Sequence, residues 1–349
     1  MRLPNLASLG ISLLAIASAP LGCAADGAAD DEDIAFDEAP KIIGTNDLVT
    51  VLQDGANIPA KYGPLLDAFG RISNGCTATH IGGGLAIAAG HCFRAPSTRR
   101  DNIQCPTYSV AWGFRKDDPS YMTSQCQIVL AGEYNRNRDY AIFVVRPIPP
   151  VEVAVDYAAR PAVGTPITIF GHPRSRPLEW SQLCTVQPAS NGGYGVDMFT
   201  HQCDTEGGSS GSSILDDRTL KVIGIHDGGR VPWNYGTFLA NTPLAELMEG
   251  PLDIPPIVRF TSPTGATATS TATVRGVINV TVSAEDLDGT VSSVTFKLPD
   301  GTTPTVERPP FTVSFDTRLV SNRTYTLEAT ATDDAGGKST ATQRIRVSN

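Results

Sequence analysis

The sequence lacks several features that would indicate other classes of protein. It has no basic stripe: 27 Lys and Arg stand against 36 Asp and Glu, a formal net charge of −9. A chain of this charge gives no electrostatic footprint for nucleic acid. Helical periodicity is nearly absent before residues 242–249. The apolar run from about Leu6 to Ala19 is too short and poorly placed to span a membrane. We therefore expect an all-β globular protein without a nucleic-acid partner.

The N-terminal residues are typical of an export signal. A short basic segment, an apolar run and small residues follow one another, and we assign residues 1–23 as a signal peptide. Leu21-Gly22-Cys23 also resembles a lipoprotein processing site with Cys23 as the lipidated residue, although Pro20 replaces the usual Leu. Two outcomes stay open: a membrane tether through Cys23 on the outer surface, or ordinary cleavage near Ala24 and free secretion.

A strongly acidic segment, residues 24–41, follows the signal. It contains one base, Lys41, and the acids Asp26, Asp30, Asp31, Glu32, Asp33, Asp37 and Glu38. We interpret the segment as a propeptide, with a solvated spacer as the alternative.

Residues 42–250 consist of short apolar runs separated by Gly, Pro, Asn and Asp. This pattern predicts antiparallel strands in a barrel or sandwich, for example at 84–88, 141–145, 167–170 and 222–225. One short helix is predicted at the end of this region, where Thr242 precedes Pro243 and Gly250 ends the run.

The composition changes after a Pro-rich linker at residues 251–256. Residues 257–349 have no Cys, many Thr, Val and Ser, and alternating strands that predict a β-sandwich. This segment resembles the bacterial immunoglobulin-like modules appended to secreted enzymes. Its acidic turn Glu285-Asp286-Leu287-Asp288 could bind calcium, but a solvated turn is the simpler interpretation.

The cysteine count is odd. Seven Cys become six once Cys23 is set aside, an even number that suits disulfides in an oxidising compartment. A zinc site is the competing interpretation, but no two candidate ligands have finger-like spacing apart from the adjacent His91 and Cys92. We therefore expect no metal and no cofactor.

Three short segments carry residues suited to catalysis. Each has an ordinary explanation: His91 as a core histidine, Asp139 as a turn residue opening a strand, and Gly207 to Ser213 as a flexible loop. Their order, His then Asp then Ser, and their separations along the chain are those of one known arrangement of a catalytic triad.

The flanking residues make this similarity specific. Ala88-Ala89-Gly90-His91-Cys92, Asp139-Tyr140-Ala141-Ile142 and Asp204-Thr205-Glu206-Gly207-Gly208-Ser209-Ser210 resemble the histidine, aspartate and serine motifs of the chymotrypsin superfamily. The serine motif is similar to that of the bacterial glutamyl endopeptidases. Gly90 departs from the usual Ala. The resemblance implies a double antiparallel β-barrel over about residues 42–249 and disulfides that we pair as Cys76–Cys92, Cys105–Cys126 and Cys184–Cys203.

The resemblance also implies roles for individual residues. Ser210 would be the nucleophile, His91 the base and Asp139 its partner, with the amides of Gly208 and Ser210 as the oxyanion hole. In the glutamyl endopeptidases, residues matching Thr205 and His226 and the mature N-terminal amine bind an acidic side chain. Cleavage after Lys41 would place that amine on Ile42. A pocket for a neutral polar side chain is the alternative, because the histidine also occurs in relatives with other preferences, and Asp227 adds negative charge nearby.

These observations predict an exported, monomeric serine endopeptidase that cleaves protein or peptide substrates, with a preference for Glu. The alternatives are an inactive protease homologue and a surface-binding protein. In the latter, the C-terminal domain would be the main actor, with a cell-surface or polysaccharide ligand.

Overall fold

The computed structural model describes residues 42–349 except 119–121, 189–196, 231, 250–252 and 265–270. The signal peptide, Cys23, the acidic segment and Lys41 lie outside the described residues. Within the described part, no helix is both long and apolar enough to cross a membrane.

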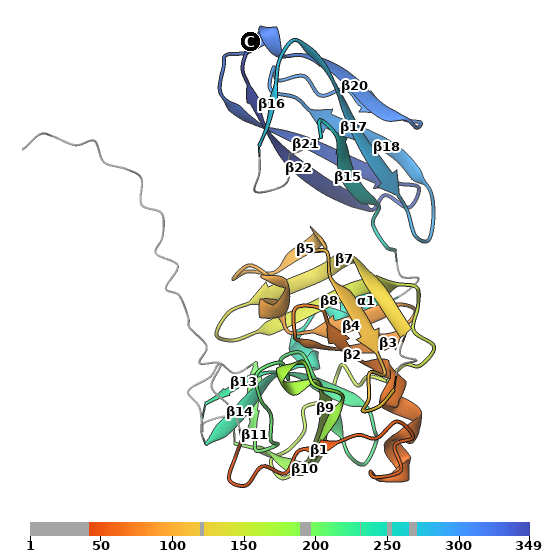
Figure 1. The fold of residues 1–349 in the computed structure, drawn as a ribbon, viewed down its shortest axis with the longest axis vertical. Coiled ribbons are helices and arrows are strands. Elements are labelled where there is room, and N and C mark those ends of the chain that lie inside the picture. The colour runs from red at the N-terminus through yellow and green to blue at the C-terminus, as the bar shows by residue number, and fades with distance from the viewer. Residues whose placement is uncertain (1–41, 119–121, 189–196, 231, 250–252, 265–270) are drawn as a thin grey trace, which may run out of the picture. The chain divides into compact units, whose positions relative to one another are not determined.

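The first barrel is closed by a ring of antiparallel pairings in the order β2-β3-β4-β8-β7-β6, with β5 added at the edge of β7. Figure 1 shows these strands in orange to yellow. Their bounds are β2 Phe69–Ile72, β3 Thr77–Gly82, β4 Leu85–Ala88, β5 Arg100–Gln104, β6 Ser109–Trp112, β7 Met122–Tyr134 and β8 Asp139–Arg146.

The second barrel closes in the same way, in the order β9-β10-β11-β14-β13-β12, with β1 added at the edge of β10. Its strands are mostly green in Figure 1. Their bounds are β1 Val49–Thr50, β9 Pro166–Gly171, β10 Glu179–Gln187, β11 Met198–His201, β12 Ser213–Asp216, β13 Val222–Arg230 and β14 Trp233–Phe238. The predicted double antiparallel β-barrel is therefore confirmed.

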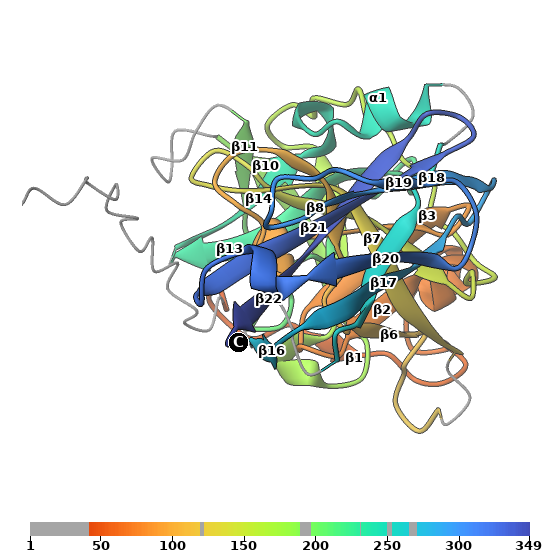
Figure 2. The same ribbon diagram turned by 90° about the horizontal axis from the view of Figure 1, so that it is seen from above.

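The C-terminal domain is a sandwich of two sheets, β15-β17-β20 and β16-β22-β21-β18-β19 (Figures 1 and 2). Its core takes side chains from both sheets, including Val280, Phe315, Phe296 and Leu327. The bounds are β15 Ile257–Ser262, β16 Ala272–Val274, β17 Val277–Glu285, β18 Val291–Lys297, β19 Thr305–Val306, β20 Phe311–Asp316, β21 Thr324–Asp333 and β22 Lys338–Val347. Strict alternation of buried and exposed residues along β22 satisfies the two-residue period of a strand with one buried face.

Helices are short. The predicted helix spans Leu244–Met248 (α1), and the Thr242 hydroxyl accepts a hydrogen bond from the Leu244 N–H at 3.3 Å. A nine-residue 3₁₀ helix at Ala60–Ala68 was not expected from the sequence, because it contains Gly63 and Pro64 and has little helical periodicity. Further 3₁₀ turns lie at Gly90–Phe93, Pro173–Ser175, Leu239–Asn241 and Thr317–Leu319.

Candidate active site

His91 and Asp139 meet because their strands are neighbours. His91 lies in the 3₁₀ turn that follows β4, Asp139 begins β8, and Ala88 of β4 pairs with Ala141 of β8. The His91 N–H donates to Asp139 Oδ1 at 2.9 Å, and Nδ1 of its ring lies 2.6 Å from Asp139 Oδ2. A carboxylate only accepts hydrogen bonds, so we assign the ring proton to Nδ1. Nε2 is then the nitrogen that can accept a proton.

Burial differs sharply within this pair. The Asp139 side chain is 4% exposed, whereas the His91 side chain is 29% exposed. The carboxylate is thus shielded and the imidazole reaches the surface. The Asp139 N–H donates to Thr237 Oγ1 on β14 at 3.0 Å, which ties the first barrel to the second at this point.

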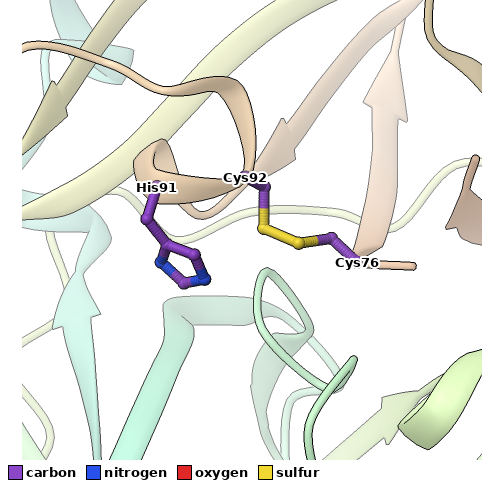
Figure 3. Close-up of side chains that lie close together, drawn as sticks. All are labelled: Cys76, His91 and Cys92. Carbon is purple, nitrogen blue, oxygen red and sulfur yellow. A yellow bond between two sulfur atoms is a disulfide. The ribbon is translucent and has the colours of Figure 1, made fainter. Parts of the chain in front are cut away.

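The turn that carries His91 is held by a disulfide and by a glycine. Cys76 and Cys92 are joined, and Figure 3 shows their bridge beside the His91 ring. A Cβ on Gly90 would lie 2.8 Å from the Tyr140 backbone oxygen and closer still to that of Glu133. Only glycine fits this approach, which explains why this chain departs from the alanine usual at that position.

Ser210 lies in the turn before β12, on the second barrel. Gly208 and Gly211 on either side have φ of +95° and +88°, where a side chain would be strained. The Ser210 backbone oxygen accepts from the Thr77 N–H at 2.9 Å, and a Cβ on Gly211 would lie 3.0 Å from the Ala89 nitrogen. The Ser210 turn therefore packs on the segment leading to His91. The Ser210 hydroxyl itself donates to the Asp227 backbone oxygen at 3.1 Å.

Two buried histidines of the second barrel lie close together, on strands that are separated by one strand. His226 is on β13 and His201 on β11, the strands that flank β14, and His201 Nε2 is 3.2 Å from His226 Nδ1. Burial lowers the pKa of His201 to about 3, so His201 is neutral. The Thr205 hydroxyl and His201 Nδ1 are both buried, and neither finds a partner among the described residues.

The sequence did not single out His201. No motif carries it, and only the pairing of β11 and β13 with β14 brings it to His226. The segment that contains the residue expected at the mature N-terminus, Ile42, also has an unexpected partner. Asp204 Oδ1 accepts from the Ile43 N–H at 2.8 Å and Asp204 Oδ2 from the Asp47 N–H at 2.7 Å. This segment therefore lies against the residue that precedes Thr205.

Asp227 is buried at a bulge in β13, close to Asp139. Thr237 Oγ1 bridges the two residues, since it accepts from the Asp139 N–H and donates to Asp227 Oδ2 at 2.7 Å. Burial, together with the charge of Asp139, raises the pKa of the Asp227 carboxyl well above its usual value. A raised pKa favours the neutral form of this carboxyl, whereas the sequence suggested a negative charge here.

Two clusters of Cys and His have the proximity that a metal site needs: Cys76 with His91 and Cys92, and Cys184 with His201 and Cys203. In both, the cysteines are joined in a disulfide, as are Cys105 and Cys126. A disulfide sulfur is not the thiolate that binds zinc. The described residues therefore place no zinc ligand set at either cluster.

Both parts of the chain match known protein families. Residues 76–225 match the trypsin-like peptidase domain and residues 256–337 match the bacterial Ig domain. No curated protein is similar enough to count as a match.

Solved structures with a similar fold include proteases. A Glu endopeptidase solved in complex with MPD is 19% identical, with a TM-score of 0.43, covering 57% of this chain and 94% of its own. The secreted serine protease VesC from Vibrio cholerae is 13% identical, with a TM-score of 0.48, covering 80% of this chain and 69% of its own.

Fibronectin(III)-like modules of Clostridium thermocellum CbhA are also similar, at 23% identity and a TM-score of 0.21, covering 26% of this chain and 94% of their own. The two family matches and the two closed barrels show that this chain joins a trypsin-like peptidase domain of the chymotrypsin fold to a C-terminal bacterial Ig domain.

Proposed function

We propose that this protein is a serine endopeptidase that uses His91, Asp139 and Ser210. The observation that carries the proposal is the double contact of the Asp139 carboxylate with His91, one bond to the backbone N–H and one to ring Nδ1. This contact fixes the tautomer in which Nε2 is a base. The peptidase family match supports peptide substrates.

The chemistry follows from these groups. Rotation of the Ser210 side chain away from the Asp227 oxygen would turn its hydroxyl toward His91. Nε2 would take the hydroxyl proton as Ser210 Oγ bonds to the scissile carbonyl carbon, then return it to the leaving amine as the C–N bond breaks. Water would repeat the sequence on the acyl-enzyme. Asp139 would stabilise the imidazolium formed in each half.

The oxyanion hole is assigned to the N–H groups of Gly208 and Ser210. Among the described residues neither N–H has an acceptor. Gly208 has a positive φ, which L side chains rarely adopt, and a Cβ there would also lie 2.8 Å from the His172 backbone oxygen. A donor of this kind contributes roughly 10²–10³ in rate.

Ser210→Ala is expected to lower kcat by roughly 10⁶, because the nucleophile is lost. Ser212→Ala is the matched control. Ser212 lies two residues away and is buried, its hydroxyl has no partner among the described residues, and we give it no catalytic role. Peptide hydrolysis and labelling by a fluorophosphonate probe would be measured in both variants. Undiminished hydrolysis by Ser210→Ala would remove Ser210 from the mechanism, and an unlabelled wild type would favour an inactive homologue.

The pocket proposal is a preference for Glu, built on His226 and Thr205. His201 is neutral and its Nδ1 lacks a partner in the described part of the chain, which favours a proton on Nε2 donated to His226 Nδ1. With Nδ1 as the acceptor of this bond, the ring proton of His226 would lie on Nε2, which we propose is directed at the substrate. An unpaired buried Thr205 hydroxyl supplies a second donor. A carboxylate leaving water needs such donors to offset its desolvation.

A peptide library is expected to show cleavage after Glu at least about tenfold faster than after Gln, about 1.4 kcal/mol in the transition state. His226→Ala should lower kcat/KM for cleavage after Glu more than kcat/KM for cleavage after Gln, so that the ratio of the two falls. Equal rates for Glu and Gln in the wild type would reject the acidic pocket and favour a neutral polar one.

Activation is proposed to follow cleavage after Lys41. The new amine of Ile42 would be one residue from the Ile43 N–H that Asp204 already holds. Asp204 is buried and lies next to Thr205 in the chain, so an ion pair with the amine would order the pocket wall. This assigns the amine to Asp204 rather than directly to the substrate, which differs from the role the sequence suggested.

A chain beginning at Ile42 is expected to be about tenfold or more faster in kcat/KM than unprocessed material. A hydrogen bond to a charged group contributes about 1.5–3 kcal/mol. Asp204→Asn in the processed chain should remove most of the gain. Equal activity of processed and unprocessed chains would contradict this activation.

We propose that Asp227, which Thr237 links to Asp139, carries a proton and is neutral. Because its pKa is raised, the native state holds more protons than the unfolded state above the usual carboxyl pKa, and stability falls as pH rises through that window. Asp227→Asn should therefore be more stable than wild type at pH 7, with the difference shrinking toward pH 4. Denaturant midpoints across that range test this, and parallel curves for the two proteins would contradict it.

Export completes the proposal. Three disulfides suit an oxidising compartment outside the cell. Secretion or a lipid tether at Cys23, a propeptide at residues 24–41 and a surface or polysaccharide ligand for residues 257–349 remain predictions from the sequence.

A further inference from the structure

One end of the Ig sandwich gathers five carboxylates from three separate segments. The first segment leads into β15, the second joins β17 to β18, and the third joins β21 to β22. The residues are Asp253, Asp286, Asp288, Asp333 and Asp334. Among the described residues of this domain, Arg318 pairs with Asp316, and no Lys or Arg forms an ion pair with any of the five.

The three segments are fastened to one another through these side chains. Asp288 Oδ2 accepts from the Ile254 N–H at 3.0 Å, and Asp334 Oδ1 accepts from the Thr290 N–H at 3.0 Å. Asp333 Oδ1 accepts from the N–H of Gly337 at 2.8 Å. The carboxylates are therefore held close together despite their like charge.

Glycines leave room between the carboxylates. A Cβ on Gly337 would lie 2.5 Å from Asp333 Oδ2 and 2.8 Å from Asp253 Oδ2, so both oxygens flank one point. A Cβ on Gly289 would similarly meet Asp286 Oδ2 at 2.7 Å and also Asp334 Oδ1.

Asp333 distinguishes this cluster from a solvated acidic turn. The residue is 3% exposed, and its Oδ2 is buried with no hydrogen-bond partner in the described part of the chain. An unpaired buried carboxylate oxygen is costly. Burial, followed by the charges of Asp333, Asp286 and Asp334, raises the pKa of Asp253.

We propose that this end of the Ig domain binds a calcium ion, with Asp333 Oδ2 as the buried ligand and Asp253 and Asp286 completing the protein ligands by side-chain rotation. Ca²⁺ takes six to eight oxygen ligands in flexible geometry, and water fills the remaining positions. Mg²⁺ demands near-octahedral geometry, which ligands drawn from three separate segments suit poorly. This site goes beyond the proposed function and does not depend on it.

The test uses the full chain, freed of divalent ions with a chelator and titrated with CaCl₂ in a calorimeter. Binding of one ion with Kd near or below about 1 mM is expected, the range of extracellular modules. At 10 mM, CaCl₂ should raise the unfolding temperature of this domain by several degrees, and MgCl₂ by much less.

Asp333→Asn should weaken calcium binding at least tenfold. Asp300→Asn is the matched control, since Asp300 is an exposed acid in the turn between β18 and β19, and it should bind like wild type. If Asp333→Asn fails to fold, Asp286→Asn takes its place. No binding and no thermal shift in the wild type would overturn the site, as would unchanged binding in a folded Asp333→Asn or Asp286→Asn variant. An equal response to MgCl₂ would overturn the assignment to calcium.

Discussion

The contact between Asp139 and His91 is the interaction on which the site depends. A buried carboxylate is costly unless its oxygens are satisfied, and here one oxygen binds the His91 amide and the other binds the ring. The same carboxylate therefore orients both the backbone turn and the imidazole. Disulfide Cys76–Cys92 and the bare backbone at Gly90 hold that turn in the position that allows both bonds.

Buried carboxylates recur in this chain, and each is accommodated differently. Asp139 has a histidine, Asp204 has two backbone amides, and Asp227 has a raised pKa that favours its neutral form. Asp333 has backbone donors for one oxygen and, within the described residues, no partner for the other. Asp227 Oδ1 and Asp333 Oδ2 are both buried without a partner among the described residues; for Asp227 we infer a proton, and for Asp333 an ion.

Local sequence patterns predict many of the strands of the peptidase domain. The apolar runs at 84–88, 141–145, 167–170 and 222–225 lie in strands except for Gly84, since a run of this length between turn residues has few other stable forms. The 3₁₀ helix Ala60–Ala68 escaped prediction because tertiary burial of Tyr62 and Leu66 stabilises it, against the weak propensity of a segment with Gly63 and Pro64.

The sequence by itself determined the all-β class, the order of two kinds of domain and the candidate residues His91, Asp139 and Ser210, because turn chemistry and motif spacing are local properties of the chain. Only the tertiary structure decided that His201 meets His226, that Asp204 holds the Ile43 segment and that Asp227 shares Thr237 with Asp139. These contacts depend on which strands become neighbours when two barrels close. Strand pairing is set by packing of the whole domain, which no short segment encodes.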